Sequence, residues 1–375
     1  MANFFGKLNP DFPDDLAVKL FSYIDIKTFI TVAPAVNKDW NRVINQDPIK
    51  KTLFSVLSQA SDFANKAPNQ IMEIKKLGGG LTNTSIFFAT AGKAFVGRRP
   101  GIHSDRFIDR EAEAYNVAIA VRLGIAAPVA YAGKKGNQIT HYLPNPKPMT
   151  PELFKDAKNL QKAAHVLKIV HGCSKQFSND IDVFARNRKM LALLKEKQVA
   201  LPPAYEIVME TMNKLERLFC ALNIKKVPCH NDTTPGNFIK SNGEMKLIDW
   251  EYSGNNDPVW DLANTSCEGE FTESQDHQLF LYYFGTWANE AYQRFLLYKP
   301  VVELWAALWT WVQIANNNMQ DSLENLRQYE QRRFENCKKL LNEAMFKNAY
   351  DYVSKLTAPT IHHSENNVIT IQPIC

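Results

Sequence analysis

The segment between residues 227 and 239 contains the side chains that are best suited to catalyse a reaction. It places His230, Asp232 and Asn237 in the order H-x-D-x-x-x-x-N, a spacing typical of loops that catalyse phosphoryl transfer. In such a loop the aspartate orients or accepts the proton of an attacking hydroxyl group, and the asparagine supplies a neutral oxygen ligand to Mg²⁺. We group His230 with the catalytic residues, although it is better placed to support the loop than to react.

A second aspartate follows where a second metal ligand is expected. The apolar residues Met245, Leu247 and Ile248 predict a short strand, and Asp249 stands directly after it. Mg²⁺ prefers oxygen ligands and also binds the phosphates of a nucleotide, so Asn237 and Asp249 would be sufficient protein ligands. The loop spacing alone arises often by chance, but the loop followed by this strand is a much more specific pattern.

A glycine-rich turn in the first half of the chain could bind phosphate groups. Residues 78–80 are three consecutive glycines, and an apolar strand follows them. Backbone N–H groups of such a turn can lie over the phosphates of a nucleotide. The residues expected to contact the cofactor here are Gly79, Gly80, Thr82 and Asn83. An ordinary hairpin turn is the alternative interpretation, because consecutive glycines before a strand also form one.

The next apolar strand ends in the basic residues Arg98 and Arg99. A phosphoryl-transfer site needs a cation for the α- and β-phosphates, and a glutamate on the following helix to hold that cation. We predict Arg98 as the cation and Glu113 as its partner. The pattern does not fully separate them from Arg99, Arg110 and Glu111, and an ordinary surface ion pair is the alternative.

Three zones of different texture must position these residues. Residues 10 to about 68 show short helical patterns with few glycines. Residues 70–143 alternate between apolar and polar as strands do, and they contain glycine turns. Residues 150–357 are mostly helical, and several prolines between residues 144 and 151 mark the join between these two zones as a hinge. The tail, residues 358–375, is polar and is expected to be flexible.

Taken together, the motifs resemble those of the choline/ethanolamine kinases, within the larger aminoglycoside-phosphotransferase-like group of kinases. The resemblance extends from about residue 71 to about residue 313, and the matching segments are 79–83, 113–116, 230–237, 248–252 and 256–263. It implies an α+β, two-lobed kinase-like fold, with a β-rich N-lobe over residues 70–148 and a mainly helical C-lobe over residues 149–357. It also implies ATP and Mg²⁺ as cofactors.

The same resemblance implies a role for each matching residue. Asp232 would be the catalytic base, Asn237 and Asp249 would be the metal ligands, and Asp261 would be a carboxylate that supports the loop. The enzyme would transfer the γ-phosphate of ATP to an alcohol group.

A small amino alcohol is the acceptor that the resemblance implies, and aromatic side chains suit it. A quaternary ammonium group has no hydrogen-bond donor, so proteins bind it with aromatic faces and carboxylates. The residues expected in the acceptor pocket are Trp250, Glu251, Tyr252, Trp309 and Gln313.

The helix around Trp309 departs from the family pattern. Trp309 and Gln313 match the W-x-x-W-x-x-x-Q pattern of choline kinases, but Ala306 stands at its first tryptophan. Trp305 is one position away, about 100° around the helix. This departure weakens the prediction of choline as the acceptor more than it weakens the prediction of a kinase. The alternative is that these tryptophans are part of the hydrophobic core.

Residues 10–54 form a separate pattern of short helices that resembles an F-box, the adaptor-binding motif of SCF-type ubiquitin ligases. The matching features are Pro13, Leu16, Leu20, residues 22–24, Val36, Trp40 and residues 47–48. The resemblance implies that a Skp-family adaptor binds this module through Pro13, Leu16, Leu20 and Trp40, and that residues 55–69 are a helical linker. The alternative is a helical extension that packs on the small kinase lobe.

Composition excludes several other classes of protein. The chain has 44 Lys and Arg against 39 Asp and Glu, a net charge of +5 that is too small to indicate a nucleic-acid partner. Its six cysteines form no C-x-x-C pair, which favours free thiols in a reducing compartment. No stretch predicts a signal peptide or a membrane span, so a cytoplasmic protein is expected. An F-box joined to a small-molecule kinase would suit a bacterial effector that acts in the cytosol of a host cell.

Two classes of function stay open at this point. The first is an ATP-dependent kinase whose acceptor is an alcohol; the kinase would act either alone or together with a bound adaptor. The second is a ubiquitin-ligase adaptor whose kinase-like domain recognises or modifies a target protein. The complete set of Asp232, Asn237 and Asp249 favours the enzyme, because a binding scaffold does not need all three.

Overall fold

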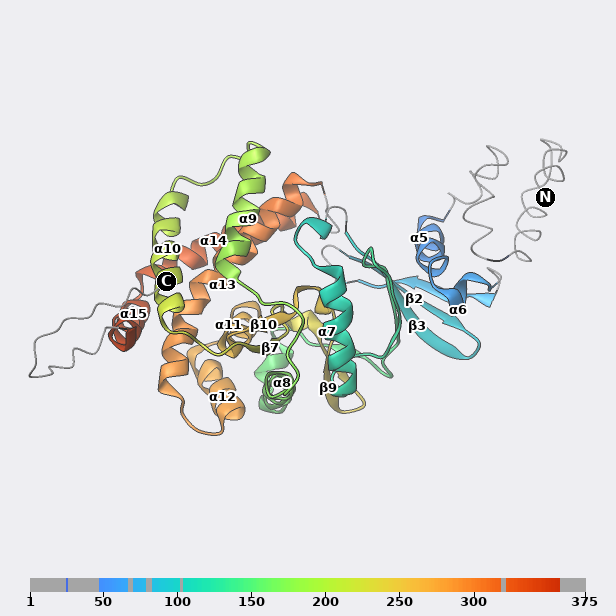
Figure 1. Ribbon diagram of the computed structural model, residues 1–375, viewed down its shortest axis with the longest axis horizontal. Coiled ribbons are helices and arrows are strands. Elements are labelled where there is room, and N and C mark those ends of the chain that lie inside the picture. The colour runs from blue at the N-terminus through green and yellow to red at the C-terminus, as the bar shows by residue number, and fades with distance from the viewer. Residues whose placement is uncertain are drawn as a thin grey trace, which may run out of the picture. The chain divides into compact units, whose positions relative to one another are not determined.

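The computed structural model describes residues 25, 47–66, 70–78, 83–101, 104–317 and 322–357. They fall into two compact units (Figure 1). The sheet unit is made of the described residues up to Lys147 and of Lys240–Glu251. The helical unit is made of Pro148–Ile239, Tyr252–Asn317 and the described residues from Ser322 on. The change from one unit to the other after Lys147 lies next to the predicted lobe boundary at residue 148.

A five-stranded antiparallel sheet, of order β1-β2-β3-β5-β4, is the centre of the sheet unit. Its elements are β1 (Met72–Lys76), β2 (Thr84–Thr90), β3 (Lys93–Arg99), β4 (Val129–Ala132) and β5 (Gln138–His141), and the helix α7 (Arg110–Arg122) connects β3 to β4. The turn from β2 to β3 is Ala91–Gly92, and both residues have positive φ, as the tightest hairpin turns require.

Two helices before the first strand complete the core of this unit. Asp47 caps α5 (Pro48–Leu57) by accepting hydrogen bonds from the next backbone N–H groups, and α6 (Ser61–Ala64) follows. The helix α5 lies beside the sheet (Figure 1). The apolar side chains of α5 and α6 form one buried cluster with those of the sheet, made of Leu53, Phe54, Val56, Leu57, Ala60, Phe63, Ile71, Ile86, Phe88, Phe95 and Ile139. Gly97 in β3 makes this approach possible, because a Cβ there would lie 2.9 Å from Leu53 Cδ1.

The predicted boundary between the helical module and its linker, at residue 54, is therefore wrong. The boundary placed at residue 54 falls inside α5, and residues 48–64 are part of the core of the sheet unit. Of residues 10–46, only Asp25 is among the described residues, so Pro13, Leu16, Leu20 and Trp40 lie outside them. The tail from residue 358 on lies outside them as well.

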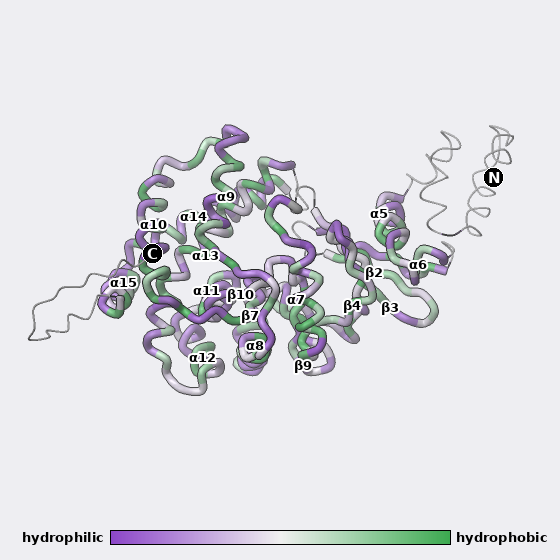
Figure 2. Tube along the Cα trace, viewed as in Figure 1, coloured by the Kyte–Doolittle hydropathy of each residue, from purple (hydrophilic) through white to green (hydrophobic). Residues whose placement is uncertain are grey.

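Eight long helices make up most of the helical unit as described. They are α8 (Ala157–His171), α9 (Val183–Glu196), α10 (Tyr205–Ala221), α11 (Pro258–Glu268), α12 (Glu273–Phe284), α13 (Asn289–Ala315), α14 (Leu323–Asn342) and α15 (Ala344–Thr357). The helix α13 is hydrophobic on all sides and packs against α9, α11, α14 and α15 (Figure 2). Among the described residues, no helix is sufficiently long and apolar to cross a membrane.

Short strands and turns position the predicted catalytic segments. In the helical unit, β7 (Val227–Cys229) pairs with β10 (Gly254–Asn256), and a helical turn, η4, covers Pro235–Asn237. A three-stranded sheet of order β6-β8-β9 contains β6 (Lys147–Pro148), β8 (Phe238–Ser241) and β9 (Glu244–Leu247), and the turn η5 covers Trp250–Tyr252. The remaining turns are η2 (Ser104–Arg106) and η3 (Leu153–Lys155). A sheet-rich part followed by a mainly helical part confirms the predicted α+β class.

Candidate active site

The predicted catalytic loop leaves the end of β7 in the helical unit and returns through η4. The side-chain Nδ2 of Asn237 donates to the backbone oxygen of Asp232 at 2.8 Å and to its carboxylate Oδ2 at 3.0 Å. These bonds fix the two side chains to each other and orient the amide of Asn237, whose Oδ1 is the atom that could bind a metal ion. The loop therefore presents a carboxylate and an amide oxygen together, as phosphoryl transfer requires.

His230 has a supporting position in this loop. Its side chain is fully buried, and its Nδ1 accepts a hydrogen bond of 3.3 Å from the backbone N–H of Asp232. A group with this burial and this partner holds the backbone that carries Asp232. The structure thus places His230 behind the loop and does not place it where an acceptor could reach it.

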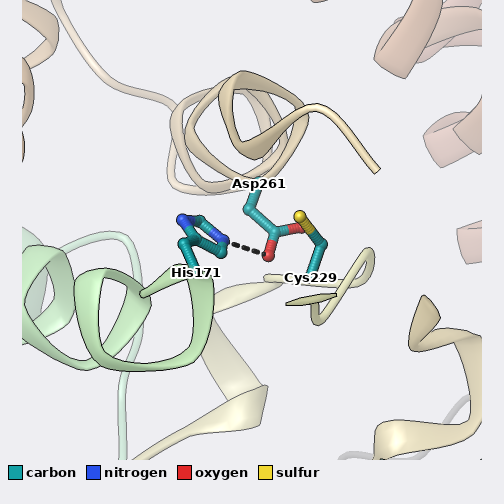
Figure 3. A group of neighbouring side chains, drawn as sticks. All are labelled: His171, Cys229 and Asp261. Atoms are coloured by element: carbon teal, nitrogen blue, oxygen red, sulfur yellow. Dashed lines mark hydrogen bonds and ion pairs between the residues drawn. The ribbon is translucent and has the colours of Figure 1, made fainter. Parts of the chain in front are cut away.

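Asp261, in the first turn of α11, supports the same loop through its backbone. Its carboxylate accepts hydrogen bonds of 2.8 Å from the backbone N–H groups of both His230 and Asn231. His171 of α8 lies 3.0 Å from Asp261 Oδ2 through its Nε2 (Figure 3), and its Nδ1 lies 2.8 Å from the hydroxyl of Tyr283. A chain of buried polar groups therefore connects the loop with α8, α11 and α12.

Cys229 completes a compact group with His171 and Asp261, whose potential ligand atoms lie within 4.8 Å of one another (Figure 3). We interpret this group as structural and not as a metal site. Both oxygens of Asp261 already accept backbone N–H groups. Burial, followed by the nearby carboxylates of Asp261 and Asp257, raises the pKa of the Cys229 thiol well above its ordinary value, so the thiolate that a metal needs is disfavoured.

The predicted cation and its partners lie in the sheet unit. Arg98, in β3, forms a buried ion pair with Glu113 of α7 and donates from Nη1 to Asp249 Oδ1 at 2.7 Å. Burial alone would lower the pKa of Arg98, but the carboxylates of Glu113, Asp249 and Glu251 outweigh it and raise that pKa. The structure thus brings the predicted pair of Arg98 and Glu113 together with Asp249, which was predicted separately as a metal ligand.

Asp249 has an unusual backbone conformation for a residue with a side chain. Its φ is 61°, in the left-handed region, and its carboxylate is 28% exposed while its neighbours in the ion-pair group are buried. The strand β9 ends two residues earlier, at Leu247, and the turn at Asp249 directs its carboxylate toward Arg98. This is the most accessible carboxylate of the group, which suits a metal ligand.

A second arginine, predicted only as a neighbour of the cation, holds the same group. Arg110, at the start of α7, donates from Nη1 to Glu113 at 2.7 Å and to Glu251 at 3.0 Å, and from Nη2 to Ser104 at 2.6 Å. Gly136 has φ +84°, and a Cβ there would lie 2.5 Å from Nε of Arg110. The signal that could have indicated Arg110 is its position one helical turn before Glu113.

Two residues predicted for the acceptor pocket, Trp250 and Glu251, are buried elsewhere: Glu251 in this ion-pair group and Trp250 in the core. Glu251 is buried and accepts from Arg110 and from Asn83 Nδ2, the latter at 3.0 Å. Burial and the charge of Asp249 raise the pKa of Glu251 to about 7, although Arg98 and Arg110 oppose the shift. Trp250 is also buried and donates to the backbone oxygen of Leu247, so its ring is part of the core. Of the predicted phosphate-binding residues, Gly79, Gly80 and Thr82 lie outside the described residues.

The aromatic residues predicted for the acceptor lie together in the helical unit. Trp309 Nε1 donates to the hydroxyl of Tyr252 at 3.0 Å, and the ring of Trp305 meets that of Tyr252 edge-on at 5.6 Å between centroids. Trp309 and Tyr252 are half-buried, whereas Trp305 and Gln313 are buried. Trp309 and Tyr252 are therefore the members of the predicted pocket whose rings a ligand could reach.

A loop with a joined aspartate and asparagine, and a buried arginine–glutamate pair between a strand and the next helix, define the class of ATP-dependent kinases with two lobes. The comparisons with known proteins identify the family. A family model described as choline/ethanolamine kinase matches residues 74–298, and the chain belongs to this family. It is thus an ATP-dependent kinase, and ATP and Mg²⁺ are the cofactors of such enzymes.

Individual relatives agree with this assignment. The chain is 30% identical over 277 residues to the protein LicA of Haemophilus influenzae, a match that covers 70% of this chain and 99% of LicA. The crystal structure of a choline/ethanolamine kinase family protein from Mesorhizobium loti matches with a TM-score of 0.68 and 29% identity, over 80% of this chain and 97% of that one. Choline kinase LicA from Streptococcus pneumoniae shares the fold, with a TM-score of 0.66 and 23% identity over 79% of this chain and 99% of that one. These matches confirm the kinase-like fold with its sheet-rich and helical parts.

Proposed function

We propose that this enzyme transfers the γ-phosphate of ATP to the hydroxyl group of a small amino alcohol. The observation that carries the proposal is the hydrogen-bonded pair of Asp232 and Asn237, held by Asp261 at the end of β7. In this role the Asp232 carboxylate orients the acceptor O–H and takes its proton while the oxygen–phosphorus bond forms and the bond to ADP breaks.

Asn237 and Asp249 are the residues that would hold Mg²⁺. Their oxygen atoms suit the ion. The amide nitrogen of Asn237 is hydrogen-bonded to Asp232, which leaves its oxygen for the metal, and the carboxylate of Asp249 is the most exposed carboxylate of the ion-pair group. When bound, Mg²⁺ would neutralise the charge of the phosphates. Arg98, fixed by Glu113, would bind the α- and β-phosphates, and the backbone near Asn83 would lie over them.

An amino alcohol is proposed as the acceptor because of the aromatic pair Tyr252 and Trp309 in the same unit as the catalytic loop. The names of the relatives, choline kinase and ethanolamine kinase, agree with this class of acceptor. The test is transfer of labelled γ-phosphate from ATP to ethanolamine, choline and glycerol, with Mg²⁺ and with excess chelator. Phosphorylation of the amino alcohols above glycerol, lost with chelator, is the expected result. Transfer to none of the three would contradict the proposal.

Replacing Trp309 by leucine should weaken binding of the amino alcohol without weakening binding of ATP. An aromatic face contributes about 0.5–2 kcal/mol to the binding of a cation, so KM for the acceptor should rise by about twofold to thirtyfold while KM for ATP stays unchanged. Steady-state kinetics on both substrates measure this difference.

Two further variants separate the ring of Trp309 from its hydrogen bond and from general effects. Tyr252→Phe removes the hydroxyl that accepts from Trp309 and keeps both rings, so KM for the acceptor should change little. Trp287→Leu replaces a tryptophan that is 45% exposed and should leave both KM values unchanged. An equal rise of both KM values in Trp309→Leu, or loss of the fold, would show that Trp309 is core.

We further propose that the F-box-like pattern before α5 binds a Skp-family adaptor, in a protein that acts in the cytoplasm of a host cell. The last residues of the predicted module, 48–54, belong to the core of the sheet unit instead. The support is the resemblance at Pro13, Leu16, Leu20 and Trp40, together with the capped start of α5 at Asp47–Pro48, where the F-box pattern ends. The alternative use of such a module is a ubiquitin ligase whose kinase domain recognises or modifies a target protein.

Pro13→Ala combined with Leu16→Ala should abolish adaptor binding and leave phosphate transfer unchanged, because both residues precede every segment of the kinase. Co-purification of the full-length protein with the adaptor, followed by the kinase assay on the same sample, measures both properties. A wild-type chain that does not retain the adaptor would rule out the module, and a target that is retained without being phosphorylated would favour the ligase alternative.

A further inference from the structure

A positively charged side chain lies on the aromatic residue that was predicted to bind the acceptor. Arg186, in α9, places its guanidinium carbon 5.7 Å from the centroid of the Tyr252 ring, over its face. Its Nη1 also donates to the backbone oxygen of Tyr252 at 3.5 Å. This is the arrangement of a cation–π contact in which the cation belongs to the protein.

Two tryptophans of α13 also contact Tyr252. Trp309 donates to its hydroxyl, and Trp305 meets the ring edge-on. One face of the Tyr252 ring is therefore occupied by Arg186, and the contacts with Trp305 and Trp309 fix the position of the ring. A cationic ligand that needed this face would have to displace the guanidinium.

Arg186 keeps its charge in this position. An arginine is not deprotonated in proteins under ordinary conditions, even where burial lowers its pKa, as it does here. The carboxylate of Asp232 opposes that shift, so the guanidinium is within electrostatic range of the proposed base as well as in contact with Tyr252.

We propose that Arg186 is a specificity residue that disfavours quaternary ammonium acceptors, so that the enzyme prefers an alcohol with a primary ammonium group. This inference rests on the proposed function. A trimethylammonium group has no N–H donor and depends on aromatic faces, and Arg186 covers one of them. A primary ammonium group can instead bind oxygen acceptors through its N–H groups, so it loses less when the aromatic face is taken.

The test compares the ratio of kcat/KM for choline to that for ethanolamine in the wild type and in Arg186→Met, which keeps an unbranched, flexible side chain and removes the charged head group. We expect ethanolamine to be preferred by the wild type, and the ratio to rise by about twofold to thirtyfold in Arg186→Met. Arg186→Lys keeps a charge and should leave the ratio near that of the wild type. Arg188→Met, on the same helix, removes an exposed arginine that pairs with Glu216, and it should change nothing.

A wild type that prefers choline, or an active Arg186→Met enzyme with an unchanged or lower ratio, would overturn the inference. If Arg186→Met does not fold, inhibition of the wild type decides the question. Methylammonium should inhibit transfer to ethanolamine more strongly than tetramethylammonium, and the reverse order would overturn the inference. A failure of the proposed function would look different, because the wild type would then transfer phosphate to none of these alcohols.

Discussion

Replacing Asp232 or Asp249 by alanine should lower kcat for phosphate transfer by a factor on the order of 10³ or more, equivalent to about 4 kcal/mol of activation free energy. The Asp232→Ala variant lacks the carboxylate that orients the acceptor hydroxyl and that accepts a hydrogen bond from Asn237. The Asp249→Ala variant lacks the exposed carboxylate that is proposed to bind Mg²⁺ and that forms an ion pair with Arg98. Single-turnover transfer of labelled phosphate to ethanolamine measures the effect.

The control for these two variants is Asp351→Ala, which removes an exposed carboxylate from α15. It should retain wild-type turnover, and all three variants should keep the wild-type circular dichroism spectrum. Wild-type turnover in both Asp232→Ala and Asp249→Ala would show that the catalytic assignment is wrong.

Removing residues 1–68 should unfold the sheet unit, whereas removing residues 1–45 should leave it folded. A chain that begins at Gln46 keeps α5 with its Asp47 cap, and α6. A chain that begins at Asn69 loses Leu53, Leu57 and Phe63 from the core. Truncating one such buried side chain costs about 2–5 kcal/mol, so losing three costs about 6–15 kcal/mol, which matches the usual stability of a domain, about 5–15 kcal/mol. Thermal unfolding of the two truncated chains measures the difference.

A point variant tests the same contact in the full-length chain. Leu53→Ala should lower the free energy of unfolding of the sheet unit by about 2–5 kcal/mol, because Leu53 is completely buried against Gly97 and its neighbours. Lys51→Ala, on the exposed side of α5, should change it by less than about 0.5 kcal/mol. A stable, cooperative chain that begins at Asn69 would show that α5 and α6 are dispensable.

Local spacing was sufficient to predict the catalytic loop. The hydrogen bonds from Asn237 to Asp232 join residues five positions apart, so the distance along the chain fixes the geometry. The pairing of Arg98 with Glu113 was also predictable, because the cation at the end of β3 was expected to pair with a glutamate of the next long helix, and Glu113 lies in the first turn of α7.

Contacts between segments far apart in the sequence were not predictable from one chain. Arg110 reaches Glu251 across 141 positions, and Arg186 reaches Tyr252 across 66, and neither spacing has a recognisable pattern. Trp250 and Glu251 were expected beside Tyr252 because they are adjacent in sequence, but the turn η5 directs both into the interior. The helix α5 was divided between the predicted module (residues 10–54) and the predicted linker (residues 55–69), because its amphipathic pattern does not show which surface it covers.

The left-handed backbone at Asp249 restricts how this enzyme can change during evolution. At a φ of 61°, asparagine and glycine are accepted readily, whereas a β-branched residue adds backbone strain to the loss of the carboxylate. A single nucleotide change converts an aspartate codon to one for asparagine or for glycine. A lineage that abandons catalysis at this position therefore has two inexpensive routes to a folded pseudoenzyme, and those two residues are the ones to look for in inactive descendants.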